Sequence, residues 1–367
     1  MIIPANPNAQ YQSYKKDIDS ALKKVISSGR YILGEEVREF EKEFAEFNET
    51  KFSIAVGSGT EALHICLTAC GIGSNDEVIT VAHTAVATAS AISLSGATPR
   101  FVDIEDDSFS IDASKIESLI NKKTKAIIPV HIYGNPVDMK MIMKIAKKHN
   151  LFVIEDCAQA HGAYFESKRV GSFGHMSCFS FYPTKNLGAI GDGGAIITNS
   201  KTFAKECNLI REYGWRKRYI SESRGWNSRL DEIQASILRI KLKNLDKDNN
   251  KRRSIAEIYN NDLSNFNSDI VTPSERDKCK HVYHLYVIKT SKRNELKDHL
   301  ERNEVITTIQ YPVPIHLQPF YKNIKLNKNL FNTETVAKKI LSLPIYPELK
   351  KSKVKEVIKC IKNFYTT

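Results

Sequence analysis

Short apolar runs alternate with helix-like segments along the first two thirds of the chain. The runs are rich in β-branched and aromatic residues and lie at 52–56, 77–81, 100–104, 126–133, 151–155, 177–182 and 194–198. Between them, apolar residues recur at helical spacing, as in the lysine-rich segment that ends near residue 149. Continuous apolar strands separated by helices are typical of a mostly parallel sheet covered on both faces. We therefore predict an α/β fold whose ligands bind beyond the carboxyl ends of the strands.

The pattern changes near residue 250. A helix is predicted from Asp231 to Lys247, and a second one continues through Ile255 and Leu263. After it come the strand-like HVYHLYVIK, a helix near 294–303 and the run VITTIQYP. A chain of 367 residues is long enough for two domains. We predict a large ligand-binding domain with an N-terminal arm over residues 1–249, and a smaller α/β domain over residues 250–367.

The chain is basic, with 54 Lys and Arg against 42 Asp and Glu and a net charge of +12. The basic residues are spread along the sequence, and the denser stretches WRKRY (215–219) and NKRRS (250–254) have no zinc-finger spacing or basic arm beside them. We therefore expect no nucleic-acid partner. Attraction of an anionic small substrate, or simply a lysine-rich composition, explains the charge better.

Seven cysteines are scattered through the chain without a CxxC pair. This spacing favours reduced, mostly buried thiols, and we expect no metal site. No apolar run approaches the length of a membrane span, and the first residues lack the layout of a signal peptide. We expect a cytoplasmic protein that does not bind membranes.

Three predicted strand ends carry candidate chemistry. The first strand leads into Gly57-Ser58-Gly59-Thr60 before a helix, which suits a phosphate, although a capped glycine turn is the plain alternative. The strand LFVIE ends at Asp156, either a capping or ion-paired residue or the partner of a cationic ring nitrogen.

The third feature is the stretch SFYPTKNLGAIGDGGAIITN, residues 180–199, which contains Lys185. A lysine becomes a nucleophile when desolvation lowers the pKa of its amine. The run before Lys185 is apolar, and the glycines after it permit close approach of a bulky ligand. A lysine in an exposed loop is the alternative. Phosphate turn, strand-end aspartate and lysine together match the needs of pyridoxal phosphate (PLP).

Long motifs extend this match over nearly the whole chain. They are YILGEEVREFEKEFAEF, GSGTEAL, EDCAQAHGA, SFYPTKNLGAIGDGGA, RGWNSRLDEIQASIL and YPVPIHLQPFY. In this order they resemble the nucleotide-sugar aminotransferases of PLP fold type I, often called the DegT family. The resemblance implies a homodimer whose active sites lie between the two chains.

The resemblance also implies roles for single residues. Lys185 would bind the coenzyme covalently and move the proton between substrate and coenzyme carbons, Asp156 would pair with the pyridinium, and Gln159 would contact the ring hydroxyl. The phosphate would be held by residues of two strand ends and of the neighbouring subunit, namely Gly59, Thr60, Ser180 and the neighbour's Asn227. The sugar nucleotide would meet Tyr182, His316, Arg216 and Arg218, although His316 also fits a packing or capping role and the two arginines also fit an exposed loop.

One position departs from the family. Many members have an aromatic residue that stacks on the coenzyme ring where this chain has Ala85, in AHTAVATA. His83 is near in sequence, and we leave the stacking residue unassigned.

The segments HTAVATA, FYPTKN and REYGWRKRYISESRGWNSRLDE most resemble the branch that aminates C3 of dTDP-linked 3-keto-6-deoxyhexoses with L-glutamate as donor. The alternatives are amination of C4 or another carbon of a UDP- or GDP-linked sugar, and a non-catalytic regulator or sensor. A related sugar dehydratase is disfavoured, because that branch replaces the lysine by histidine.

Overall fold

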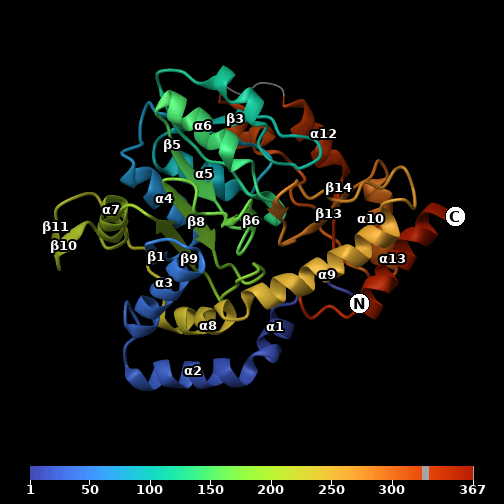
Figure 1. Ribbon diagram of the computed structural model, residues 1–367, viewed down its shortest axis with the longest axis horizontal. Coiled ribbons are helices and arrows are strands. Elements are labelled where there is room, and N and C mark those ends of the chain that lie inside the picture. The colour runs from blue at the N-terminus through green and yellow to red at the C-terminus, as the bar shows by residue number, and fades with distance from the viewer. Residues whose placement is uncertain (325–329, 367) are drawn as a thin grey trace.

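A seven-stranded sheet forms the centre of the molecule in a computed structural model, which describes residues 1–324 and 330–366 (Figure 1). Five neighbouring strands are parallel, and β9 runs antiparallel to both of its neighbours. The spatial order is β1 (Phe52–Val56), β9 (Gly194–Thr198), β8 (Met176–Ser180), β5 (Phe152–Asp156), β4 (Thr124–Ile127), β2 (Glu77–Val81) and β3 (Thr98–Val102). The predicted α/β fold with a mostly parallel sheet is confirmed.

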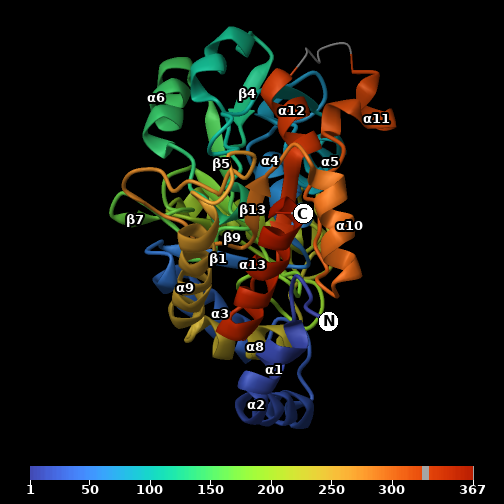
Figure 2. The ribbon, with the colours of Figure 1, turned by 90° about the vertical axis from the view of Figure 1, so that its right-hand side faces the viewer.

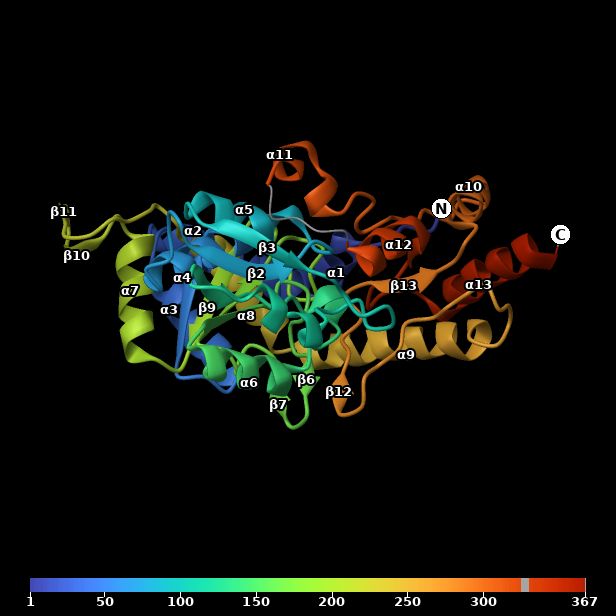
Figure 3. The ribbon, with the colours of Figure 1, turned by 90° about the horizontal axis from the view of Figure 1, so that it is seen from above.

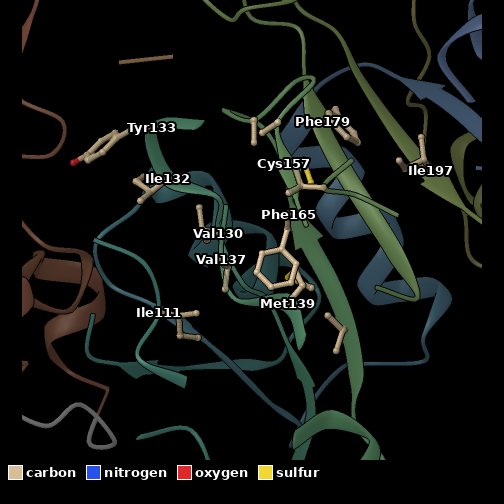
Figure 4. Close-up of a cluster of buried hydrophobic side chains, with 14 of the residues drawn as sticks. Ile111, Val130, Ile132, Tyr133, Val137, Met139, Cys157, Phe165, Phe179 and Ile197 are labelled. Carbon is tan, nitrogen blue, oxygen red and sulfur yellow. The ribbon is translucent and has the colours of Figure 1, made fainter. Parts of the chain in front are cut away.

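Each strand contributes side chains to a hydrophobic cluster on either face of the sheet. In β9, Ala195 and Ile197 belong to one cluster and Ile196 to the other, as the alternation of side chains along a strand requires. The first cluster holds helices α3 (Glu35–Phe47), α6 (Met139–His149) and α8 (Glu232–Leu242), and the second holds α4 (Gly59–Ala69), α5 (Val86–Leu94) and α7 (Lys201–Arg211). Figure 4 shows part of the first cluster, with Phe179 and Ile197 on neighbouring strands. Because both faces are covered, the strands read as continuous apolar runs.

A third hydrophobic cluster lies in the C-terminal part of the chain, whose ribbon Figure 2 shows in orange and red. It is built from side chains between Ile255 and Ile361, together with Ile2. Its elements are α9 (Leu245–Leu263), α10 (Arg293–Arg302), α13 (Lys351–Thr366) and the antiparallel strands β13 (Tyr286–Lys289) and β14 (Ile340–Leu343). The predicted boundary after residue 249 falls inside α9, and the division into two domains stays a prediction.

Smaller elements complete the chain. They are α1 (Pro7–Ser13), α2 (Lys15–Ser28), β6 (Tyr164–Phe165), β7 (Lys168–Arg169), β10 (Trp215–Lys217), β11 (Ile220–Ser221), β12 (Cys279–Lys280), α11 (Pro319–Lys322) and α12 (Phe331–Lys339). The β10–β11 hairpin extends outward beyond α7 at one end of the molecule (Figure 3). Among the helices of residues 1–324 and 330–366, none has the length and apolar character needed to cross a bilayer.

Two predicted elements differ from the structure. The strand expected over 126–133 ends at Ile127, because the chain next passes Pro129, which lacks an N–H, and turns at Tyr133 with a φ of 59°. The helix expected over 231–247 stops at Leu242, and α9 starts at Leu245. At the break the Asn244 side chain donates to the Ile240 carbonyl at 3.0 Å, a local bond that competes with helix continuation.

A buried carboxylate joins α8 to the start of α3. Glu232 accepts from the backbone N–H groups of Gly34, Glu36 and Val37 at 2.7, 2.9 and 3.0 Å. These are the N–H groups that a helix start leaves without an intrahelical acceptor, and a negative charge is favourable there. A side chain at Gly34 would lie 2.7 Å from the Glu232 carboxylate, so glycine is required for this approach.

We predict that Glu232→Ala lowers the free energy of unfolding by roughly 2–4 kcal/mol, because three buried N–H groups lose their charged acceptor. Urea unfolding measures the change. Glu232→Gln keeps one acceptor oxygen and serves as the matched variant with a smaller loss. Equal stability of Glu232→Ala and the wild type would contradict the assigned cap.

Candidate active site

A cavity of about 290 Å³ opens at the carboxyl ends of the central strands. Its walls bring together most of the predicted site, namely Gly59, Thr60, Asp156, Gln159, Ser180, Tyr182 and Lys185. These residues come from the ends of β1, β5 and β8 and from the loop after β8. The position agrees with the rule that open α/β sheets bind ligands at this edge.

One end of the cavity is a cradle of backbone at the start of α4. Ser58 caps this helix by accepting from the N–H of Glu61 at 3.2 Å, and Gly59 and Thr60 lie in the first turn, where N–H groups have no intrahelical acceptor. A side chain at Gly59 would lie 2.7 Å from Cβ of Ser180, and one at Gly194 would lie 2.5 Å from the Ser58 backbone. The absence of side chains therefore lets two backbone segments close around a small anion. A phosphate group fits this arrangement.

Asp156 lies buried on another wall, and each of its carboxylate oxygens has one donor. The Thr88 hydroxyl donates to Oδ2 at 2.8 Å, and the Ala158 N–H donates to Oδ1 at 3.1 Å. The Thr88 oxygen lies 3.2 Å from that of Thr84. Burial raises the pKa of Asp156, against the smaller effects of Thr88 and of the Lys185 charge. A cationic ring nitrogen in the cavity would offset the burial cost and favour the ionised carboxylate.

Gln159 is held in one orientation by two tyrosines. Its Oε1 accepts from the Tyr133 N–H at 2.7 Å, and its Nε2 donates to the Tyr311 hydroxyl at 3.1 Å. The Tyr133 hydroxyl in turn is 2.7 Å from Nε2 of His83 and donates to the Gln310 carbonyl. The second Nε2 hydrogen of Gln159 is therefore available to an oxygen acceptor in the cavity, as a ring hydroxyl would require.

Lys185 lies half-buried in a turn between β8 and the glycine-rich stretch. The backbone N–H of Lys185 donates to the Tyr182 carbonyl at 2.8 Å, and this bond closes the turn. Burial lowers the pKa of the Lys185 amine to about 8, although the Asp156 charge acts in the opposite direction. The lower pKa increases the neutral fraction of the amine near neutral pH, which makes it a better nucleophile and proton acceptor.

The position that carries a stacking aromatic residue in many relatives belongs to the cavity wall. Ala85 and Ala87 line the cavity there. His83 is buried, and Nε2 of its ring pairs with Tyr133. The side chains on this wall are thus methyl groups, and the residue that would stack on the coenzyme ring stays unassigned.

The remaining predicted residues lie outside the cavity of their own chain. Asn227 is exposed near the base of the β10–β11 hairpin. Arg216 is also exposed and pairs with Glu222 at 2.8 Å, and Arg218 lies over the Tyr219 ring at 4.9 Å. Their roles stay predictions.

His316 is buried, and its Nε2 lies 3.0 Å from Oε1 of Glu334. This contact agrees with the packing role that the sequence left open, and a role in sugar binding stays a prediction. The sequence did not point to four residues that orient the cavity side chains, namely Thr84, Thr88, Tyr133 and Tyr311. The two threonines had a usable signal, since positions four apart at the start of a helix lie on one face.

A buried cluster of possible metal ligands lies beside the site. The ligand atoms of His131, Glu155 and Cys157 are within 4.8 Å of one another. However, Nε2 of His131 pairs with Glu155 at 3.1 Å, and Nδ1 accepts from the Val137 N–H at 3.0 Å. Both ring nitrogens are engaged, so the cluster is a hydrogen-bond network that braces β5.

Comparison with known families adds an independent observation. The model of the DegT/DnrJ/EryC1/StrS aminotransferase family matches residues 12–362. A "pleiotropic regulatory protein" of Geobacillus stearothermophilus is 45% identical, with 97% of this chain and 96% of that protein covered. The dTDP-3-amino-3,6-dideoxy-alpha-D-galactopyranose transaminase of Aneurinibacillus thermoaerophilus is 44% identical, with 96% of each chain covered. A UDP-N-acetyl-3-dehydro-alpha-D-glucosamine 3-aminotransferase of Acidithiobacillus ferrooxidans is 38% identical over 96% of this chain and 95% of that protein.

Solved structures agree with this picture. DesV of S. venezuelae, in complex with a ketimine intermediate, superposes with a TM-score of 0.97 at 39% identity and covers 100% of this chain and 98% of that one. NtdA of Bacillus subtilis, with bound cofactor PMP, gives a TM-score of 0.92 at 32% identity and covers 97% of this chain and 82% of that one.

We predict that Thr88→Val weakens PLP binding about tenfold, because Asp156 loses a donor to its charged form and its pKa rises further. Absorbance titration of the coenzyme-free protein with PLP measures the affinity. Thr88→Ser keeps the hydroxyl and is expected to bind like the wild type. Unchanged affinity in Thr88→Val would show that Thr88 does not support the Asp156 carboxylate.

Proposed function

The chain belongs to the DegT/DnrJ/EryC1/StrS aminotransferase family, and from this premise we propose that it transfers the amino group of L-glutamate to C3 of a dTDP-linked 3-keto-6-deoxyhexose. The products would be a dTDP-3-amino-3,6-dideoxyhexose and 2-oxoglutarate. Family membership makes the protein a PLP-dependent sugar aminotransferase. The observation that carries the proposal is one cavity that holds a phosphate cradle, a buried Asp156 and a lysine of lowered pKa.

The residues of the cavity divide the chemistry between them. The first turn of α4 and Ser180 would hold the coenzyme phosphate, and Asp156 would keep the ring nitrogen protonated. When bound, PLP supplies the electron sink that makes a carbon next to the nitrogen acidic. Nζ of Lys185 would take the proton from the α-carbon of the donor and deliver it to the coenzyme carbon. For the sugar it would carry a proton in the opposite direction, from the coenzyme carbon to the sugar carbon. One amine placed between both carbons gains from proximity.

The choice of C3 and dTDP rests on the resemblance of HTAVATA and FYPTKN, and on the relative named as a dTDP-3-amino-sugar transaminase. Relatives named for UDP-linked sugars favour the alternative of a UDP-linked or other nucleotide sugar. The regulatory name of the 45% identical relative favours the alternative of a regulator. We expect catalysis, since the cavity residues that the coenzyme needs are present together.

We further propose a cytoplasmic homodimer that serves the biosynthesis of surface-polysaccharide or glycan sugars. The seven cysteines are all free thiols, as expected in a reducing compartment. The exposed position of Asn227 near the base of the outward β10–β11 hairpin supports contact with a second chain.

A substrate panel tests the reaction. We expect turnover when the protein is incubated with PLP, L-glutamate and a dTDP-3-keto-6-deoxyhexose, and slower or no turnover with 4-keto sugars or UDP- and GDP-linked sugars. Mass spectrometry identifies the nucleotide product, and NMR locates the amine. Preference for another nucleotide or carbon would overturn the substrate assignment while leaving the aminotransferase intact. A protein that binds PLP but transfers no amine would favour the regulator.

Lys185→Ala is expected to reduce turnover on the order of 10³-fold or more, because the amine that moves the proton is lost. Single-turnover kinetics with glutamate, followed by absorbance, measure the first half-reaction without the sugar. Lys201→Ala, on the exposed start of α7, is the matched control that should retain wild-type turnover. Parental turnover in Lys185→Ala would refute the assigned role.

Sharing of active sites is testable by mixing two defective variants. Lys185→Ala removes the amine, and Asn227→Asp places a carboxylate against the phosphate of the neighbouring site. Random mixing makes about half of the dimers mixed, each with one intact site, so about a quarter of wild-type activity should return. No recovery after co-refolding, with mixed dimers verified by mass spectrometry, would place Asn227 in the site of its own chain. Wild-type activity of Asn227→Asp by itself would place Asn227 outside both sites.

A further inference from the structure

Asn186 follows the reacting lysine directly and is buried. Its side chain uses both donors and one acceptor. Nδ2 donates to Oδ1 of Asn249 at 2.8 Å and to the Val282 carbonyl at 3.0 Å, and Oδ1 lies 3.2 Å from Nδ1 of His284. These partners lie on α9 and in the segment before β13. A single amide therefore joins the lysine loop, defined here as residues 182–189, to two segments from the C-terminal third of the chain.

The orientation of this amide follows from its neighbours. Nδ2 of Asn249 donates to the His161 carbonyl at 2.8 Å, and a carbonyl can only accept, so Oδ1 of Asn249 must face Asn186. The Val282 carbonyl is also an acceptor only. Oδ1 of Asn249 and the Val282 carbonyl therefore both require a donor from Asn186. If the Asn186 amide were rotated by 180°, its oxygen would face these two acceptor oxygens instead.

The same reasoning assigns the tautomer of His284. Because Oδ1 of Asn186 can only accept, Nδ1 of His284 must carry the hydrogen. Burial, supported by the nearby Lys185 charge, lowers the pKa of His284 well below its usual value, so the ring stays neutral. Because the ring is neutral, burial remains the cause that lowers the pKa of the Lys185 amine.

The segment that receives Asn186 also braces the opposite side of the cavity. The Val282 N–H donates to the Gly134 carbonyl at 3.1 Å, and the Leu285 N–H donates to the Tyr133 carbonyl at 3.3 Å. Tyr133 in turn donates to Gln159. Residues 281–285 therefore connect Lys185 on one side of the cavity with Gln159 on the other.

Two further hydrogen bonds restrain the lysine loop, and one of them comes from α8. Nζ of Lys241, on α8, donates to the Gly188 carbonyl at 2.6 Å, and the Ala189 N–H donates to the Phe181 carbonyl at 2.7 Å. These bonds hold the end of the loop. Asn186 holds its middle, at the residue next to the reacting amine.

We infer that Asn186 is a positioning residue for Lys185, which acts by pinning the lysine loop to residues 281–285 so that the amine stays in the cavity and away from water. The inference rests on the proposed function only in taking Lys185 as the reacting amine, and it is independent of which sugar is the substrate. It predicts that loss of the Asn186 side chain changes the reactivity of Lys185 more than it changes the phosphate cradle at the start of α4.

The test compares Asn186→Ala with the wild type in two measurements. In the coenzyme-free protein, Lys185 is labelled by reductive methylation across pH 6–11 and quantified by peptide mass spectrometry. The half-labelling pH should move from about 8 toward the ordinary lysine value of 10.5, because water reaches the freed amine. With PLP and substrates, kcat should fall on the order of 10²-fold at nearly unchanged KM, since misplacement of a reacting group affects the chemical step.

Asn48→Ala is the control for stability. Asn48 is also buried, but it caps α3 through the Phe44 carbonyl at 2.7 Å and lies outside the cavity lining. This variant should lose stability while keeping the wild-type labelling profile of Lys185 and the wild-type kcat of the enzyme. If Asn186→Ala behaves like Asn48→Ala in both measurements, Asn186 has a structural role only and the inference is overturned.

A second pair of variants, at His284, tests the same hydrogen bond in case Asn186→Ala does not fold. His284→Leu removes the donor to Oδ1 of Asn186, whereas His284→Asn offers an N–H near the same place. The labelling shift and the loss in kcat should be smaller in His284→Asn than in His284→Leu. Equal effects of the two would contradict the bond on which the inference depends. If the wild type turns over none of the sugars while the labelling of Lys185 shifts as predicted, the proposed function fails and the positioning role of Asn186 stands.

Discussion

The site depends on the burial of opposite charges at one edge of the sheet. Asp156 and Lys185 lie in the same cavity, and loss of water raises the pKa of the acid and lowers that of the amine. Their mutual attraction works against both shifts but does not cancel them. In the protein alone this arrangement is unfavourable, because buried charge needs compensation. A ligand with a cationic ring would compensate the buried Asp156 carboxylate, and its phosphate would meet the free N–H groups at the start of α4, so the fold itself favours the coenzyme.

The sheet makes this burial possible. The parallel strands β5 and β8 bring Asp156 and Ser180 to one edge, and the glycines near β1 and β9 let the backbone close beside them. Around this edge the supporting bonds come from elements far away in the chain. Thr88 of α5 supports Asp156, Tyr133 and Tyr311 support Gln159, and α8 and α9 restrain the lysine loop. The positions of the reacting groups are therefore set by tertiary contacts, while their identities are set by local motifs.

This difference explains what could be predicted from the sequence. The apolar runs and the residues after them are local signals, and they led to the sheet, to Gly59, Asp156 and Lys185, and to their common cavity. The break between α8 and α9 was missed because it depends on one side-chain bond of Asn244. Periodicity gave no means to see that His316 faces Glu334, or that Asn186 reaches His284, since each contact joins segments whose relative positions come only from the folded chain.

The coenzyme cavity and the predicted sugar-nucleotide arginines lie in different parts of the chain, and this separation bears on how related enzymes differ. The cavity residues that fit the coenzyme lie at the ends of the central strands, in the loop after β8 and at the start of α4. The arginines predicted for the sugar nucleotide, Arg216 and Arg218, lie instead on the exposed β10–β11 hairpin, which extends outward beyond α7. Changes in such a hairpin leave the buried charges and their supporting bonds intact. A family built in this way can keep one backbone, as the TM-score of 0.97 to DesV at 39% identity illustrates, while members take different nucleotide sugars.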